Sequence, residues 1–294
     1  MATPIDVNRR LLESVRDEPK KMLLPISGYE KVNVKTLEEA CEPIKDIFDK
    51  KLQQYIIIAK MNSTDPKNGL TPDESASIHL YTLEWDEHEN SLYMILNRTL
   101  RLTDRTKLQP WFRYLKLFLT AFYKLPESEH TLIWRGVRED LSALYPKGKE
   151  FAWWAFSSCT ASIDVLESPN YVGKSGTRTI FSIQTSSGKN IQVHSYFENE
   201  DEILLPPGIY LKVIGSLKPA EGLHIVQLRE IPPPYQMLAE PFDLSQLKKA
   251  LPESKPSSSI SSSHRKQEDY PIADAPSKSH KEVSSKSSKL RLFH

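Results

Sequence analysis

The sequence predicts an α+β fold in which a helical N-terminal half is followed by two small, mainly antiparallel sheets. In the first half, apolar residues recur at the spacing of an α-helix, whereas the second half contains short β-rich runs separated by turns. The helices precede the strands instead of alternating with them. This order favours segregated layers over the repeated βαβ units of a parallel sheet.

Three segments carry the helical prediction. Residues 71–74 read Thr-Pro-Asp-Glu, which has the spacing of a capping box with proline at the first helical position, so we expect a helix from there to about residue 84. Apolar residues continue at helical spacing over 90–101 and, most clearly, over 107–124, where leucine and aromatic residues form a stripe. Such a stripe is typical of a buried core.

The β-rich runs of the second half are bounded by glycine, proline and serine, which favour turns. They cover residues 131–137, 151–156, 177–185, 189–194, 202–205, 209–214 and 224–228. The prolines at 232–234 end the strand region near Ile231, because proline cannot donate to a sheet ladder.

The chain divides into an N-terminal extension (1–24), one folded domain (25–250) and a tail (251–294). The tail is rich in serine and lysine and has few large apolar residues. It cannot bury enough apolar surface to offset the entropy of ordering, so we expect it to be disordered.

Composition limits the classes of partner. The 294 residues carry a net charge of +1, so no overall basic excess favours nucleic acid or an anionic membrane. The chain lacks an apolar run long enough to span a bilayer. Residues 1–10 also lack the apolar run that is typical of a secretory signal. The two cysteines, Cys41 and Cys159, are interpreted as reduced thiols. We therefore expect a cytoplasmic protein with no nucleic-acid or membrane partner.

Arg135 is the first candidate functional residue. It lies within the apolar β-rich run 131–137, where a charge has to be satisfied. A phosphate or a carboxylate suits the fork of a guanidinium, and a structural ion pair would also explain the residue. The second candidate is Ser158, one of the small residues 157–160 at the end of the run 151–156, although many strands end in serine and threonine.

The third candidate is the acidic run 200–202. Strand periodicity places Glu200 and Glu202 on one face, roughly 7 Å apart, with Asp201 on the other. Two carboxylates on one face repel each other, which raises the pKa of one of them. Such a pair suits work on a cationic transition state, and an exposed acidic turn is the alternative.

Taken together and in this order, Arg135, Ser158 and the Glu-Asp-Glu run 200–202 resemble the arginine–serine–glutamate signature of the arginine-specific mono-ADP-ribosyltransferases. This family includes vertebrate ecto-enzymes and binary bacterial toxins. The resemblance covers about residues 25–232 and includes the Ile-Leu-Leu-Pro-Pro run after Glu202 and the segment 69–74. Cys159 and Thr160 depart from the family's usual Thr and Ser, and the paired cysteines of secreted members are missing.

The resemblance implies that two small sheets hold NAD in a cleft. Arg135 would bind the NAD phosphates, and Gly136 would offer backbone groups to the nicotinamide amide. Ser158 would orient Glu202, the catalytic carboxylate, which would contact the 2′-hydroxyl of the nicotinamide ribose. A fixed carboxylate there stabilises the positive charge that develops as nicotinamide leaves.

The resemblance also implies an acceptor. Glu200 would position a guanidinium and take its proton, which predicts an acceptor protein with an exposed arginine. NAD, or NADP, would be the co-substrate, without a metal. The loop 161–178 would close over the nucleotide, with Tyr171 or Phe181 stacking on nicotinamide, although core packing is favoured for Phe181. Residues 195–197 would contact the acceptor.

Three alternatives remain open at this point. Water as the acceptor would make the protein an NAD glycohydrolase, because both reactions share the first step. An inactive NAD-binding module is a second alternative. A cysteine hydrolase using Cys159 and His194 is supported only by the residue types.

Overall fold

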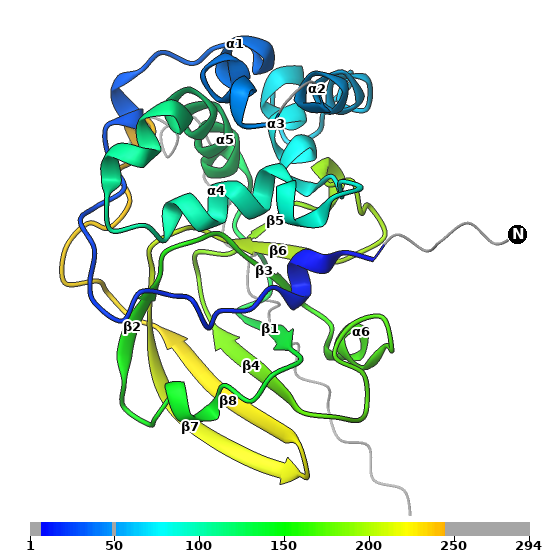
Figure 1. The fold of residues 1–294 in the computed structure, drawn as a ribbon, viewed down its shortest axis with the longest axis vertical. Coiled ribbons are helices and arrows are strands. Elements are labelled where there is room, and N and C mark those ends of the chain that lie inside the picture. Colours follow the sequence, from blue (N-terminus) through cyan, green and yellow to red (C-terminus); the bar gives the residue numbers. More distant parts are fainter. Residues whose placement is uncertain (1–6, 49–50, 245–294) are drawn as a thin grey trace, which may run out of the picture. The chain divides into compact units, whose positions relative to one another are not determined.

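The computed structural model describes residues 7–48 and 51–244, so the predicted tail lies outside the described residues. Figure 1 shows the helices of the first half gathered on one side of the sheet strands. Residues 7–24, which the sequence sets apart as an extension, belong to the same compact unit as the rest of the domain. The predicted boundary at residue 24, between an extension and the catalytic domain, stays a prediction.

Helices dominate residues 37–124. The α-helices are α1 (Leu37–Cys41), α2 (Lys51–Met61), α3 (Pro72–Thr82), α4 (Leu92–Leu100), α5 (Phe112–Lys124) and, between strands, α6 (Ile163–Glu167). The 3₁₀ helices are η1 (Arg9–Leu12), η2 (Tyr29–Lys31), η3 (Glu42–Ile47), η4 (His88–Asn90), η5 (Arg105–Trp111), η6 (Ser142–Leu144) and η7 (Gln192–His194).

The predicted start of α3 is confirmed. The Thr71 hydroxyl accepts a hydrogen bond from the Glu74 amide, and the Glu74 carboxylate accepts one from the Thr71 amide, so the capping box is complete. The predicted helix 107–124 divides into η5 and α5, because Pro110 supplies no amide for a continuous α-helix. The apolar stripe of α5 is buried in the core, as the spacing predicts.

The strands form one eight-stranded sheet. They are β1 (Leu132–Val137), β2 (Glu150–Trp153), β3 (Ser157–Thr160), β4 (Arg178–Gln184), β5 (Lys189–Asn190), β6 (Glu202–Leu205), β7 (Ile209–Ala220) and β8 (Leu223–Glu230). Their order is β2-β7-β8-β4-β1-β3-β6-β5, and β4 and β8 are the parallel pair in an otherwise antiparallel sheet.

The helical half and the mainly antiparallel strands agree with the predicted fold class. The two small sheets are joined, since Trp134 on β1 pairs with Thr160 on β3 and makes the hydrogen-bonded order continuous. This junction matters for the site because β1, β3 and β6 become neighbours. In Figure 1 the N-terminal segment (residues 7–18), drawn in dark blue, runs below α4 across the face of the molecule, close to β1 and β3.

Candidate active site

Three adjacent strands bring the three predicted motifs together. Arg135 lies on β1, Ser158 on β3, and Glu202 is the first residue of β6. Glu202 pairs with Thr160 across the ladder between β3 and β6. The side chains of Arg135, Ser158 and Glu202 are 1%, 2% and 0% exposed. Residues far apart in the sequence therefore form one buried polar cluster.

Arg135 is a buried cation whose partners are neutral. Its Nη1 donates to the carbonyl oxygens of Arg10, at 3.1 Å, and of Ser158, and its Nη2 donates to that of Glu13 at 2.7 Å. Its Nε has no hydrogen-bond partner. Among the described residues Arg135 forms no ion pair, and burial lowers the pKa of its guanidinium. An anionic group placed here would relieve that cost.

Glu202 is paired with a residue that sequence reasoning missed. Arg10, in η1, contacts it with two nitrogens: Nη2 lies 2.7 Å from Oε2 and Nε 3.2 Å from Oε1. The Ser195 hydroxyl donates to Oε2 at 3.3 Å. The expected hydrogen bond from Ser158 is not formed, since the Ser158 hydroxyl is buried without a partner.

The Arg10 guanidinium is enclosed on several sides. It also donates to the carbonyl oxygen of Thr82, and its centre lies 5.6 Å from the ring centre of Tyr93 and 5.3 Å from that of Phe197. Burial by itself lowers the pKa of Arg10, but the charge and hydrogen bonds of Glu202, together with the charges of Glu84 and Tyr93, outweigh it and hold the pKa above its ordinary value. Arg10 therefore stays charged at this buried position.

Glu200 lies in the turn before β6, not on the strand as periodicity predicts. The Glu202 amide donates to the Glu200 carbonyl, so the chain turns between the two residues. The Glu200 carboxylate accepts hydrogen bonds from the Tyr171 hydroxyl and, at 2.8 Å, from the Asn8 amide. Its pKa is raised, chiefly by burial and further by the charge of Glu202, in agreement with the expectation of one raised pKa.

The residues predicted to contact the nicotinamide, Gly136, Phe181 and Tyr171, differ in their surroundings. A Cβ atom on Gly136 would lie 2.6 Å from a methyl group of Val172, so the loop 161–178 packs closely on that glycine. Phe181 is fully buried, with its ring centre 4.9 Å from that of Tyr145, which agrees with the favoured core interpretation. Tyr171 is 7% exposed, and its hydroxyl is bound to Glu200.

Residues 195–197 do not form an exposed patch. Ser195 is fully buried and Phe197 is 8% exposed, so Tyr196 is the one of the three that reaches solvent, at 37% exposure. The prediction of an acceptor-contacting patch therefore reduces to a single ring. The Ser195 side chain points inward. Its hydroxyl donates a hydrogen bond to the Glu202 carboxylate and accepts one from the Phe197 amide.

The cysteine-hydrolase alternative gains no support. Cys159 is fully buried, and burial raises the pKa of its thiol to about 12, so the nucleophilic thiolate is disfavoured. The ring nitrogens of His194 are engaged elsewhere, with the Ser75 hydroxyl at 2.9 Å and the Asn68 amide oxygen at 3.1 Å. The arrangement lacks the base beside a reactive thiol that this chemistry needs.

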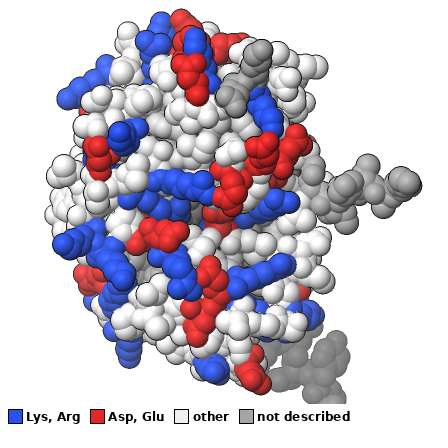
Figure 2. Space-filling view, in the orientation of Figure 1, with Lys and Arg blue, Asp and Glu red and all other residues white. Residues whose placement is uncertain are grey.

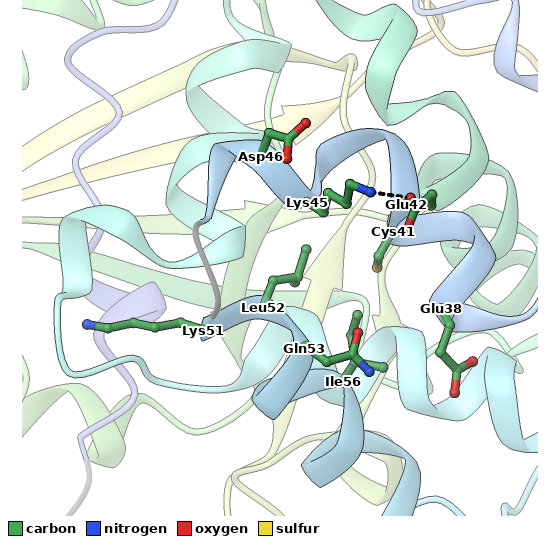
Figure 3. A pocket seen from close by; sticks show the side chains of 9 residues that line it. All are labelled: Glu38, Cys41, Glu42, Lys45, Asp46, Lys51, Leu52, Gln53 and Ile56. Atoms are coloured by element: carbon green, nitrogen blue, oxygen red, sulfur yellow. Dashed lines mark hydrogen bonds and ion pairs between the residues drawn. The ribbon is translucent and has the colours of Figure 1, made fainter.

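Two open hollows are lined by none of the predicted site residues. One of about 690 Å³, between α1, η3 and α2, is drawn in Figure 3; its nine lining residues include none of the predicted site residues. Another of about 610 Å³ borders the N-terminal segment and is lined by Arg9, Glu13, His88 and Arg138, among others. On the face in Figure 2, acidic and basic side chains are interleaved across the middle of the molecule.

Residues 31–233 match the protein family described as NAD:arginine ADP-ribosyltransferase. The chain belongs to this family. The reaction class is therefore ADP-ribosyl transfer, with NAD as the substrate and proteins as the family's acceptors. The match begins after residue 30, so the segment that carries Arg10 lies outside it.

Similar solved structures include ADP-ribosyltransferases from several sources. HopU1 of Pseudomonas syringae is 21% identical, with a TM-score of 0.46 over 68% of this chain and 90% of that one. The Vis toxin of Vibrio splendidus in complex with agmatine is 18% identical, with a TM-score of 0.44 over 69% and 90%. A mutant of the eukaryotic enzyme ART2.2 in complex with NAD is 16% identical, with a TM-score of 0.47 over 68% and 85%. A search of curated proteins finds no match.

Within the described residues, no helix is long and apolar enough to cross a membrane. The same part of the chain holds no group of three or more His, Cys, Asp or Glu side chains arranged to hold a metal ion.

Proposed function

We propose that this protein transfers ADP-ribose from NAD to an arginine side chain of an acceptor protein and releases nicotinamide. Family membership gives the transfer and the NAD; the arginine acceptor and the residue roles are the proposal. One observation carries it: a buried arginine without a counter-anion, Arg135, lies in the same cluster as a buried carboxylate, Glu202.

The fit to NAD rests on unused hydrogen-bonding capacity. The Nε of Arg135 and the hydroxyl of Ser158 are buried without partners. Buried polar groups are normally satisfied, so such a pair indicates a ligand with acceptor oxygens. The NAD phosphates supply these oxygens together with the negative charge that Arg135 lacks.

Glu202 supports the cleavage of the bond between nicotinamide and C1′ of the ribose. Nicotinamide leaves as a neutral molecule with the bonding electron pair, and positive charge spreads over C1′ and the ring oxygen. A fixed carboxylate in a buried site stabilises that charge more than it stabilises the ground state. Ser195 holds one oxygen of this carboxylate, so the group is already oriented by the protein.

Glu200 serves the second half of the reaction. A guanidinium nitrogen of the acceptor forms the new bond to C1′ and loses one proton. Glu200 accepts that proton, and its raised pKa suits a general base near neutral pH. A carboxylate also matches a guanidinium in a two-pronged hydrogen bond, which favours arginine as the acceptor.

The test is an assay of labelled NAD, repeated with NADP, with and without agmatine as a small guanidinium acceptor. We expect Glu202→Gln to lower both nicotinamide release and transfer by roughly 10²–10³-fold. We expect Glu200→Gln to lose transfer but to keep nicotinamide release. Glu198→Gln, at an exposed position of the same loop, should change neither rate.

A second arm of this test addresses the phosphates. Arg135→Lys replaces the fork by a point charge and should raise the KM for NAD by about tenfold or more. Arg229→Lys on β8 is the matched strand control, because Arg229 is exposed. Nicotinamide release without labelled agmatine in the wild type would instead identify an NAD glycohydrolase. Bound NAD without any turnover would identify an inactive binding module.

A further inference from the structure

The residues that contact the candidate active site most closely come from the N-terminal segment, which we define as Val7–Glu18. Arg10 pairs with Glu202, and the Asn8 amide donates to Glu200. The backbone carbonyls of Arg10 and Glu13 accept two of the three hydrogen bonds that Arg135 makes. The segment thus contacts Arg135, Glu200 and Glu202, three of the residues of the predicted signature.

We propose that the cleft binds this segment as an internal peptide ligand in the place of NAD, so that the segment has to leave before NAD can enter. The inference rests on the proposed function, because it takes the cleft around Arg135 and Glu202 to be the NAD site. The ligand class is an arginine-bearing peptide, supplied here by the chain itself.

The chemistry of the segment matches what the site needs from NAD. The Arg10 guanidinium is a planar cation held against Glu202 and the rings of Tyr93 and Phe197. It satisfies the same carboxylate that would stabilise the positive charge on C1′ and the ring oxygen of the ribose. The carbonyl oxygens of Arg10 and Glu13 stand where Arg135 would take phosphate oxygens.

Burial makes the two occupants exclusive. With the segment in place, Glu202 is fully buried and Arg135 is 1% exposed, so a ligand cannot reach either side chain unless the segment moves. Arg10 also faces Glu202 and not Glu200, the residue proposed to hold the acceptor. Its position is therefore that of the substrate's own charge, and Arg10 competes with NAD instead of acting as an acceptor.

The segment is attached in a way that permits release. Its side chains anchor it: Leu11 and Val15 are buried, and Glu18 binds Arg101 at 2.6 Å and the Trp154 amide at 2.7 Å. Among the described residues, its backbone-to-backbone hydrogen bonds run within the segment and not to the sheet or the helices. It can therefore detach without breaking a strand ladder.

The first test compares Arg10→Ala with Arg9→Ala. The Arg9 side chain is exposed, so its variant is the matched control. If the segment competes with NAD, Arg10→Ala should lower the apparent KM for NAD by about tenfold or more, because the competitor loses its main anchor. Arg9→Ala should leave the KM unchanged. An unchanged KM in both variants would overturn the proposal.

A second test keeps the proposal testable if the Arg10→Ala variant is too unstable to assay. A protease site placed at the exposed pair Lys20–Lys21 lets the intact chain fold before it is cut. Cutting should lower the KM for NAD, and a synthetic peptide of residues 7–18 should then inhibit in competition with NAD. The same peptide with Arg10→Ala should not inhibit. Equal KM values before and after the cut, with no inhibition by the peptide, would contradict the proposal.

Calorimetry with NAD separates failure of this proposal from failure of the proposed function. Tighter NAD binding after the cut, without turnover, would support the internal ligand while contradicting the enzymatic function. Turnover that is equal in all forms would contradict only the internal ligand. If NAD binds neither the cut nor the intact protein, both proposals fail.

Discussion

Arg10 and Arg135 come from two different regions, the N-terminal segment and the strand β1, and their guanidinium groups lie in the same cluster. Both are almost completely buried. Arg10 is matched by the carboxylate of Glu202, and its pKa is raised. Arg135 is matched by three carbonyl oxygens, and burial lowers its pKa.

The difference between the partners of Arg10 and Arg135 indicates that the two buried charges have different roles. The protein itself neutralises Arg10, so that residue contributes to holding the segment in place. Arg135 keeps an uncompensated charge, which costs stability and is retained where a ligand supplies the anion. Each arginine should therefore respond differently to removal, both in stability and in activity.

The largest expected effect is on stability, in a double-mutant cycle between Arg10 and Glu202. Arg10→Met leaves a buried carboxylate without its cation, which should lower the free energy of unfolding by about 3–5 kcal/mol. The double variant Arg10→Met with Glu202→Gln should recover much of that loss, since no unpaired charge remains. Urea unfolding of the single and double variants measures the coupling.

Arg135→Met provides the contrast within the same experiment. It removes a cation that has no counter-ion and leaves only neutral carbonyls behind, so it should destabilise the protein less than Arg10→Met. If Arg135→Met is the more destabilising of the two, the interpretation of Arg135 as a charge reserved for a ligand is wrong.

A smaller effect is expected at His88, which links the N-terminal segment to the helical half. Hydrogen bonds with Glu13 and Glu84, with burial opposing, raise the pKa of His88 to about 9. The Tyr93 hydroxyl also faces the ring at 2.8 Å, and Arg10 lies 3.9 Å from Glu84. A raised pKa in the folded state means that the stabilisation is fully present below about pH 6.5 and is lost as pH rises through about 9.

The measurement compares the wild type with His88→Phe at about pH 6 and about pH 10, on either side of this titration. The difference in the free energy of unfolding should be about 1.5–3 kcal/mol at the lower pH and should shrink at the higher one. A difference that does not change with pH would show that the charge of His88 plays no part. His130, which is exposed and forms no ion pair within the described part of the chain, supplies the control substitution His130→Phe.

The local parts of this fold could be predicted from the sequence because their causes are local. The capping box at Thr71 and the apolar stripe of α5 depend on residues three or four positions apart. Most strand runs were found for the same reason, but the predicted run 189–194 was wrong in its second half, where residues 192–194 form the 3₁₀ helix η7. The order of the strands was not found, because the parallel pairing of β4 with β8 depends on contacts that no short window contains.

The site was predicted in part. Arg135, Ser158 and Glu202 were candidates from the sequence pattern, the family resemblance implied their roles, and the structure places them on adjacent strands. Arg10 was missed because its partner is 192 positions away, and a basic pair near a terminus gives no periodic signal. Glu200 was placed on a strand by spacing, but the turn before β6 begins there instead.

The smallest expected effect distinguishes the two serines of the cluster, Ser195 and Ser158. The Ser195 hydroxyl already binds Glu202, whereas that of Ser158 has no partner among the described residues. Ser195→Ala should therefore lower the free energy of unfolding by about 1 kcal/mol, because a formed hydrogen bond is lost. Ser158→Ala should leave stability nearly unchanged and act only when NAD is bound, where it should raise the KM or lower kcat. Urea unfolding and NAD turnover of both variants measure the two effects. If Ser158→Ala lowers stability as much as Ser195→Ala, the Ser158 hydroxyl has a structural partner and is not available to the substrate.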